Sequence, residues 1–346
     1  MSRALAKSPP EQAPKSAQYD LFVQFFGDSR DLSNTIELWD AIPKYAVSAR
    51  LQARMRDANG RLPIHEHEFE YRPSPRTDGQ PVRCKVSMQP ASIKTDDGQM
   101  DFYPSADEEL IEEVLKKIFT DQHYGLHDAG QPESWVRWTL NMIRRELKAR
   151  GKTRSDQEIK RSIEILTRSI YEVEITGKGR RLLYTNPILT DLTRITRSDY
   201  LDDPQSMWCA RLPAIVSKSI NELTYRQFNY GTLMSLSMPL ARWLHKRLSH
   251  QYTNASLQHP YSILFSTIER DSGLLHHSRT TEKVKTVTAV LDELSGHNVL
   301  LSHEHEKRMK GRKIDDVLFH LTPHPDFVRE IKAANARASK ARKQID

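Results

Sequence analysis

The sequence has few of the features that mark secreted, membrane-spanning or zinc-stapled proteins. Only two of its 346 residues are cysteines, Cys84 and Cys209, and they lack a Cys-x-x-Cys spacing, so we expect reduced thiols and neither disulfides nor a thiolate zinc site. No apolar run approaches the roughly 20 residues that cross a bilayer, and the start, MSRALAKSPPEQAPKS, lacks the apolar stretch of a secretory signal. These absences predict a cytoplasmic protein.

Signatures of the common enzyme classes are also missing. There is neither a Gly-x-Ser-x-Gly elbow nor a Gly-x-Gly-x-x-Gly loop. Gly151-Lys152-Thr153 resembles the end of a phosphate-binding loop, but that loop needs a further glycine upstream, at the position where Glu146 stands. We therefore expect a protein that is not an enzyme and that holds no cofactor and no metal.

Two His-x-His triplets leave one enzymatic alternative open. His65 with His67, and His303 with His305, each flank a glutamate where the metal site of an origin nickase has an apolar residue. Alternation in a strand would place His65, His67 and Tyr71 on one face, and Tyr71 would be the nucleophile of such a metal-dependent nickase. Surface histidines without a metal are the favoured interpretation.

The sequence does contain enough apolar residues for a large core, together with an excess of positive charge. Its length, with 38% apolar and 28% charged residues, is typical of a soluble protein with two or three compact units. The net charge of +7 and the pI near 9.2 favour a polyanionic partner, because neutralising phosphates releases condensed counterions. A solubilising excess of lysine and arginine would give the same total, so the distribution of the charge is more informative.

Composition and periodicity divide the chain into segments. The first is predicted to be a disordered arm, because its opening residues are rich in proline, alanine, serine and lysine. Strand-like alternation follows, and then two longer stretches of helical periodicity. The predicted boundaries are a disordered arm at 1–30, a strand-containing lead-in at 31–104, a first domain at 105–217, a second domain at 218–325 and a basic tail with helical propensity at 326–346.

Capping patterns and apolar spacing predict three helices in the first domain. The first helix opens with a capping box at Ser105, the second at Pro132 and the third with a capping box at Ser155. Trp135 and Trp138, spaced by three, are assigned to the core face of the second helix. The period then changes to that of strands, and IYEVEIT and RLLYTN around a glycine-rich turn predict a hairpin.

The same order returns in the second domain. Helices predicted around 240–250, 263–271 and 280–294 precede a hairpin made of NVLLSHEHE, the basic turn KRMKGRK and IDDVLFHLT. Three helices followed by a two-stranded hairpin is the order of a winged helix. We therefore predict an α+β, mainly helical fold with two tandem winged-helix domains and a flexible N-terminal arm.

In a winged helix the third helix offers its polar face to the major groove of DNA. In the first domain, Ile159, Ile163, Leu166 and Ile170 form the predicted apolar stripe, and arginine and glutamine opposite it suit guanine and adenine edges. The residues expected to contact DNA there, with the adjoining turn, are Arg154, Gln157, Lys160, Arg161, Arg168, Lys178, Arg180 and Arg181.

In the second domain the predicted stripe is Val284, Val287, Val290, Leu291 and Leu294, and small or hydroxylated residues lie opposite it. The residues expected to contact DNA are Thr281, Lys285 and Thr288 on the helix, and Lys307, Arg308, Lys310, Arg312 and Lys313 in the hairpin. Ordinary solvated helix faces are the alternative for either helix alone. Two helix–hairpin units with basic turns favour double-stranded DNA.

Two runs within residues 90–325 resemble the plasmid-encoded RepA-type replication initiators: ASIKTDDGQMDFYPSADEELIEEVLKKIF and WVRWTLNMIRRELKARGKTRSDQEIKRSIEILTRSIYEVE. The resemblance implies tandem winged helices that bind repeated origin DNA, assist its opening, and recruit the host chromosomal initiator and the replicative helicase in a bacterial cytoplasm. It also implies self-association, with dimers repressing their own promoter and monomers starting replication. A winged-helix transcriptional repressor is the alternative, because it would use the same fold.

The pentapeptide Gln18-Tyr19-Asp20-Leu21-Phe22 in the arm resembles the bacterial sliding-clamp-binding motif, with Tyr19 in place of the usual leucine. Leu21 and Phe22 would fill an apolar pocket of the clamp while Gln18 bonds its rim. A hydrophobic anchor that folds back onto the first domain is the alternative interpretation.

Overall fold

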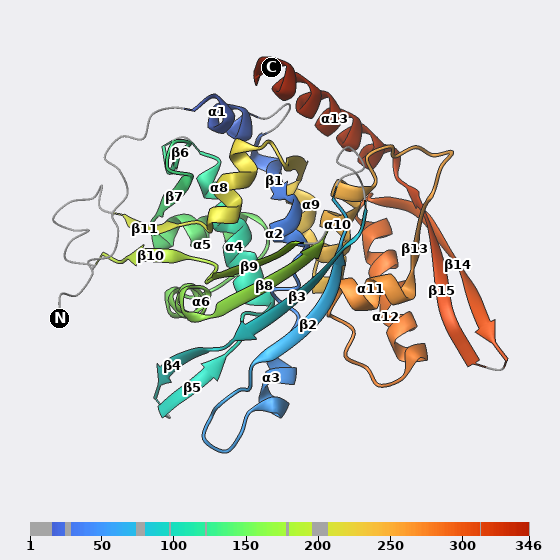
Figure 1. Ribbon diagram of the computed structural model, residues 1–346, viewed down its shortest axis with the longest axis horizontal. Helices are drawn as coiled ribbons and strands as arrows, with labels where there is room; N and C mark the ends of the chain where they lie inside the picture. The colour runs from blue at the N-terminus through green and yellow to red at the C-terminus, as the bar shows by residue number, and fades with distance from the viewer. Residues whose placement is uncertain are drawn as a thin grey trace.

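The computed structural model describes residues 16–24, 29–73, 80–96, 98–121, 123–177, 180–195, 207–311 and 313–345. The fold is α+β, as predicted, with helices packed against several small antiparallel sheets (Figure 1). No helix in these ranges is long and apolar enough to cross a bilayer. Cys84 and Cys209 are free and buried.

The first helix–hairpin unit comprises α4 (Ala106–Phe119), α5 (Leu140–Ala149), α6 (Asp156–Arg168) and the first hairpin, β8 (Ile170–Gly177) with β9 (Arg180–Asn186). The capping boxes predicted at Ser105 and Ser155 open α4 and α6. The first hairpin does not stand alone. It joins β2 (His65–Tyr71) and β3 (Val82–Gln89) in a four-stranded sheet of order β2-β3-β8-β9.

The helix predicted to open at Pro132 is wrong in its first part. Residues Glu133–Trp138 form strand β7, and helix α5 begins only after Thr139, whose side chain caps it. Strand β7 lies between β6 (Gly125–Asp128) and β11 (Trp208–Arg211), in a sheet completed by β10 (Thr190–Thr193). It packs against α4 and also against α8 (Ala214–Asn221), so its residues are buried on both faces and the alternation that identifies a strand is lost.

The second helix–hairpin unit comprises α10 (Pro239–Gln251), β13 (Tyr261–Leu264), α11 (Phe265–Ser272), α12 (Thr280–Gly296) and the second hairpin, β14 (Leu300–Lys310) with β15 (Lys313–Pro323). Its three strands pair in the order β13-β15-β14. Leu244, Leu291 and Phe319, from two helices and the hairpin, lie in its own hydrophobic core. The far half of the second hairpin projects from the body of the molecule (Figure 1).

The ends of the described chain are structured: part of the arm that was predicted to be disordered is a helix, and the tail is helical, in line with its predicted helical propensity. Residues Ala17–Val23 form helix α1, capped by Ser16, and Pro325–Ile345 form the long helix α13. Helix α13 packs against β12 (Tyr225–Asn229), which pairs with β1 (Leu32–Ile36). The remaining elements are a short 3₁₀ turn (Ser29–Asp31), α2 (Glu37–Ala41), α3 (Ala49–Met55), α9 (Tyr230–Ser235) and the hairpin of β4 (Ala91–Thr95) with β5 (Gly98–Phe102).

The two units meet through buried charges rather than through apolar side chains alone. Lys246 of α10 lies 2.6 Å from Glu113 of α4 and 3.4 Å from Asp40 of α2, and Arg242 of α10 lies 2.7 Å from Glu109 of α4. Burial alone would raise the pKa of Asp40, but nearby ammonium groups outweigh it and hold that pKa well below its ordinary value. Removing one partner would leave a buried charge uncompensated, so this network fixes how the units sit together.

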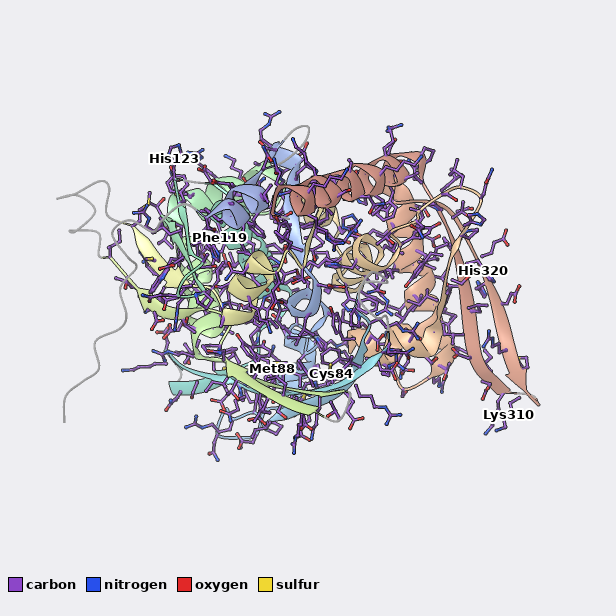
Figure 2. All side chains as sticks on the ribbon, turned by 45° about the horizontal axis from the view of Figure 1, so that its top comes forward. Cys84, Met88, Phe119, His123, Lys310 and His320 are labelled. Carbon is purple, nitrogen blue, oxygen red and sulfur yellow. The ribbon has the colours of Figure 1, made fainter. Side chains whose placement is uncertain are left out.

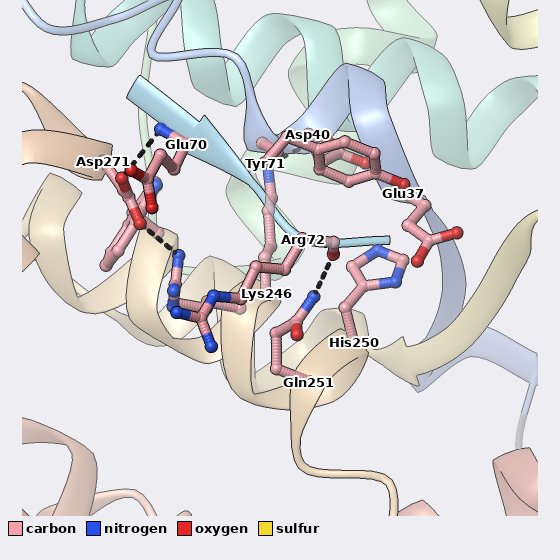
Figure 3. A pocket seen from close by; sticks show the side chains of 12 residues that line it. Glu37, Asp40, Glu70, Tyr71, Arg72, Lys246, His250, Gln251 and Asp271 are labelled. Atoms are coloured by element: carbon pink, nitrogen blue, oxygen red, sulfur yellow. Dashed lines mark hydrogen bonds and ion pairs between the residues drawn. The ribbon is translucent and has the colours of Figure 1, made fainter. Parts of the chain in front are cut away.

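A small hollow at the edge of this network is lined from both sides of the interface (Figure 3). Asp271 of α11 accepts hydrogen bonds from Arg247 at 3.0 Å and from the backbone N–H of Glu70 on β2 at 3.0 Å. The imidazole of His67 on β2 lies 2.6 Å from the carbonyl oxygen of Arg270. Strand β2, the outer strand of the four-stranded sheet, is therefore covered by α11 of the second unit.

Candidate nucleic-acid interface

Helix α12 buries the stripe that its sequence predicts. Val284, Val287, Val290, Leu291 and Leu294 are its buried residues, and the side opposite them faces outward. The outward side carries the predicted contact residues Thr281 and Lys285, both exposed, and the half-buried Thr288, followed by Ala289 and Asp292. The hydroxyl of Thr288 donates to the carbonyl oxygen of Val284 at 3.1 Å.

Lys285 is the cation at the centre of this face. Its ammonium group lies 3.0 Å from Glu282 one turn earlier, and its side chain is 74% exposed. An exposed pair of this kind contributes little to stability, so it leaves the lysine available to another acceptor. Small neighbours such as Thr281 and Ala289 would let a helix approach base edges closely.

The second hairpin extends the cationic surface beyond α12. Lys307, Arg308, Lys310 and Lys313 lie exposed near its tip, and Figure 2 shows Lys310 at the far end. Gly311, with φ of +64°, takes the left-handed conformation that the turn requires. The predicted contact residue Arg312 lies outside the described residues. Four described cations at one tip can follow a phosphate backbone without reading its sequence.

Contacts between α12 and β14 hold the helix against the hairpin. His303 lies on β14, and its Nε2 atom is 2.9 Å from a carboxylate oxygen of Asp292 on α12. The other triplet lies on β2, where His67 is committed to the backbone of α11. No group of three or more metal-ligating side chains occurs among the described residues. In the structure, His67 and His303 each make a contact between two elements.

In the first unit, the face of α6 that was predicted to read DNA is exposed, but two of its arginines contact a neighbouring hairpin. Ile159, Ile163 and Leu166 are buried as predicted, but Ile170 belongs to β8 and is 36% exposed. The hairpin of β4 and β5 packs along the helix, and Ile165 contributes to the contact.

Individual side chains of α6 are engaged by that hairpin. The guanidinium of Arg161 lies 4.2 Å from the ring centre of Phe102, and that of Arg168 donates to the carbonyl oxygen of Ser92 at 3.1 Å. Arg154 forms an ion pair with Asp107. Of the predicted contact residues on this helix, Gln157 and Lys160 remain exposed, with no side-chain partner among the described residues. The outward face of α6 is therefore exposed, but its arginines have partners within the protein.

The first hairpin also differs from the prediction. Its outer face continues across the four-stranded sheet and carries five acids against three bases: Glu66, Glu68, Glu70, Glu172 and Glu174, with Arg83, Lys85 and Arg181. Arg181 lies 2.6 Å from Glu174. Lys178 lies outside the described residues, and the side chain of Arg180 does too, although its backbone belongs to β9. A sheet face with net negative charge does not attract phosphates.

The pentapeptide is held against the body of the protein. Phe22 is only 2% exposed, and its ring meets that of Tyr225 edge-on at 4.8 Å between centres. Gln18 and Leu21 are half-buried. Two carbonyl oxygens at the end of α1 accept hydrogen bonds from the buried guanidinium of Arg337 on α13, both at 2.7 Å. The segment has the geometry of the hydrophobic anchor that was the alternative interpretation.

One cationic surface was missed. The outward face of α5 and the turn after it carry Arg144, Arg145, Lys148 and Lys152, which we call the α5 basic face. The signal was present in the sequence, because residues 144–154 contain six bases and one acid. It was hidden by the expectation that the third helix, not the second, contacts DNA.

No family model matches the chain, and no curated protein matches it. Among solved structures, domains 2 and 3 of RctB align in one structure over 82% of this chain and 99% of that chain, with 11% identity and a TM-score of 0.46. In a second structure they align over 78% and 95%, with 10% identity and a TM-score of 0.41. The Pi initiator protein in complex with iteron DNA aligns over 64% of this chain and 91% of that chain, with 11% identity and a TM-score of 0.43.

Proposed function

We propose that the chain is a sequence-specific double-stranded DNA-binding protein whose second helix–hairpin unit is a winged helix. In this proposal α12 enters the major groove and the second hairpin lies along the sugar–phosphate backbone. The observation that carries it is the combination of an outward α12 face, built of Lys285 and small residues, with a projecting cationic hairpin held next to it. The strand order β13-β15-β14 supports it, since the third strand of a winged helix lies between the other two.

In this proposal lysine, threonine and alanine make different contacts with DNA. Lys285 donates to a guanine edge or a nearby phosphate, while the methyl groups of Thr281, Thr288 and Ala289 contact thymine methyls. Lys307, Arg308, Lys310 and Lys313 supply affinity that does not depend on sequence. The protein needs no catalytic group for this function, so we propose that it is not an enzyme.

Hydroxyl-radical footprinting on the repeated DNA next to the coding gene tests the proposal. The wild-type protein is expected to protect each repeat, and Lys285→Ala is expected to weaken or shift the protection inside the repeat, with a loss of about 1–3 kcal/mol against the preferred sequence. Arg161→Ala is the matched control, because Arg161 is engaged by Phe102. Unchanged protection by Lys285→Ala would refute α12 as the reading helix.

The biological role that we propose is initiation of plasmid-type replication at repeated origin DNA. It rests on the sequence resemblance to RepA-type initiators, and the recruitment of a host initiator and helicase, self-association as a dimer, and clamp binding are parts of the same proposal. A transcriptional repressor with the same DNA-binding unit is the second candidate. Maintenance of a plasmid that depends on the repeats separates the two, since a repressor would be dispensable in that assay.

Two observations weigh against the nickase alternative. Tyr71 is half-buried, and burial together with the carboxylate of Glu37 raises the pKa of its hydroxyl far above the ordinary value, which disfavours the phenolate nucleophile. His67, which would be a metal ligand, is bonded to a backbone carbonyl. Incubation of supercoiled origin DNA with Mg²⁺ or Mn²⁺ tests this alternative, and strand breaks that disappear in Tyr71→Phe would restore it.

A further inference from the structure

Positive charge is concentrated in two short segments of this chain. Residues 144–154 contain six bases and one acid, a net charge of +5, and residues 307–313 contain five bases and no acid, again +5. The chain as a whole carries +7, so all other residues together sum to −3. The second segment is the tip of the second hairpin. The first is the end of α5 and the turn to α6, to which the proposed function assigns no contact with DNA.

The outward orientation of α5 follows from its buried side. Ile143 and Leu147, both fully buried, lie one turn apart and face the core. At 100° per residue, Arg145 and Lys148 fall on the other side and Arg144 lies at its edge, and all three are exposed. Arg144 pairs with Asp156 at 3.2 Å, whereas Arg145 and Lys148 have no acidic partner within the part of the chain that the structure describes.

The position of Lys152 is fixed by the way α5 ends. Gly151 has φ of +70°, its N–H donates to the carbonyl of Lys148 at 3.1 Å, and the N–H of Lys152 donates back to the carbonyl of Leu147 at 2.9 Å. This is a Schellman ending, which reverses the chain in a defined way. The helix dipole would favour one or two cations in this last turn, but it does not account for six bases with a single acid.

The turn lies beside the second unit. The guanidinium of Arg150, at the end of α5, lies 5.2 Å from the ring centre of Tyr230, the first residue of α9, and Ser235 at the other end of α9 lies 3.0 Å from the imidazole of His297, directly after α12. Glu293 follows Asp292, the last residue of the outward α12 face, and accepts a hydrogen bond from the backbone N–H of Ser237 at 2.6 Å. The turn at the end of the α5 basic face therefore lies near the C-terminal end of α12. The second hairpin lies on another side of α12, which it contacts through β14.

We propose that the α5 basic face binds the phosphate backbone of the same duplex whose major groove receives α12. The inference rests on the proposed function and extends it. The first unit then contributes affinity through its second helix and the following turn, and α6, whose arginines contact the β4–β5 hairpin and Asp107, reads no bases. Guanidinium and ammonium groups without internal partners are suited to phosphate oxygens, and each phosphate contact releases counterions.

The test measures binding to a fluorescent mixed-sequence duplex of about 40 base pairs, roughly four helical turns, over a range of salt concentrations. Arg145→Gln combined with Lys148→Gln keeps good helix formers at both positions. The slope of log K against log salt is expected to become less steep by about 1.8, or 0.9 for each lost phosphate contact, while discrimination between repeat and mixed DNA stays as in the wild type. Both the wild-type protein and the α5 variant are expected to bind one duplex per protein molecule.

The matched control is Arg50→Gln with Arg54→Gln, which removes the same charge from exposed positions of another helix, α3. It is expected to leave the slope as it is. A slope equal to wild type in the α5 variant, or an equal change in the α3 control, would overturn the inference while leaving α12 as the reading helix. Two duplexes bound per protein would overturn the claim that α12 and the α5 basic face bind the same duplex. A wild-type protein that binds no duplex would instead refute the proposed function.

Discussion

In the first helix–hairpin unit, strand β3 pairs with β8 along the whole hairpin. In the second unit only the base of the hairpin pairs with a third strand. Strand β13 pairs with Leu318–Leu321 of β15, and from there to the tip β15 pairs with β14 alone. The third helices also differ: Arg161 and Arg168 of α6 contact the β4–β5 hairpin, while Thr281 and Lys285 of α12 have no hydrogen-bond or ion-pair partner on another element within the described residues. Units with one order of elements can therefore engage the side chains of their third helices differently.

The difference matters because DNA contact requires side chains that are not already engaged within the protein, as well as the right order of elements. In the first unit, side chains that could have contacted bases are used to hold secondary structure together, as Arg161 and Arg168 do. In the second unit the corresponding residues make few contacts with other elements. A comparison of matched variants in the two units would establish whether the availability of these side chains or the order of the elements decides which helix reads DNA.

The largest expected effect concerns the central helices of the units and their response to acid. Helix α10 buries His245 and His250, and burial lowers the pKa of each to about 3, whereas α4 contains no histidine. A histidine whose folded pKa lies below its unfolded value of about 6.5 contributes stability above that pH and loses it as the pH falls toward 3. Between pH 7 and pH 5 we expect urea unfolding to show a loss of about 2 kcal/mol for each histidine.

A variant of one histidine provides the control for this titration. His245 packs between the rings of Phe228 and Phe327, so His245→Phe keeps an apolar contact there. We expect this variant to lose about half as much stability over the same pH interval as the wild type. Equal losses in both proteins would show that another group is responsible. Asp40 acts in a different window, because its depressed pKa makes its contribution disappear only below about pH 4.

The next effect compares the two hairpins directly. Changing Lys307, Arg308 and Lys310 to alanine removes three exposed cations from the second hairpin. We expect the salt slope of DNA binding to fall by about 2.7, which corresponds to roughly a hundredfold weaker binding at physiological salt. The matched variant of the first hairpin, with Lys178, Arg180 and Arg181 changed to alanine, should bind within about threefold of the wild type. Similar losses in both variants would remove the distinction between the hairpins.

The smallest effect is expected where the sequence suggested one of the largest. Arg161→Ala removes the cation above Phe102, and we expect it to lower the free energy of unfolding by about 0.5–1 kcal/mol. DNA affinity and sequence preference should be unchanged, since the guanidinium of Arg161 is already engaged by Phe102. Thermal unfolding and anisotropy on the same samples measure both quantities. A clear loss of affinity with unchanged stability would mean that Arg161 contacts DNA.

The sequence predicted the second unit well because its elements follow local rules. The apolar stripe of α12, the capping boxes of α4 and α6 and both hairpins are signals within a few residues of each other, and the structure confirms them. The site on α12 follows from the same stripe, since one buried face defines the opposite face. Its use in DNA binding stays a prediction.

The predictions that the structure corrects concern features that depend on contacts between segments far apart in the sequence. Trp135 and Trp138 fit a helical spacing, but β7 is buried on both sides by α4 and α8, so it shows no strand alternation. The covering of α6 needs residues 91–102, and the burial of Lys246 needs Asp40, more than two hundred residues earlier. Local patterns carry no information about such partners.

The contact of Arg337 with the end of α1 has a consequence for the order of folding. Its hydrogen bond to the carbonyl oxygen of Phe22 joins residues 315 positions apart, and closing so long a loop costs several kcal/mol of chain entropy. Contacts of this sequence separation form slowly, so we expect the cores of the two units to form first and α13 to dock onto α1 last. Pulse-labelled hydrogen exchange should then protect the amides of α12 before those of α1, and simultaneous protection would argue for closure at the start.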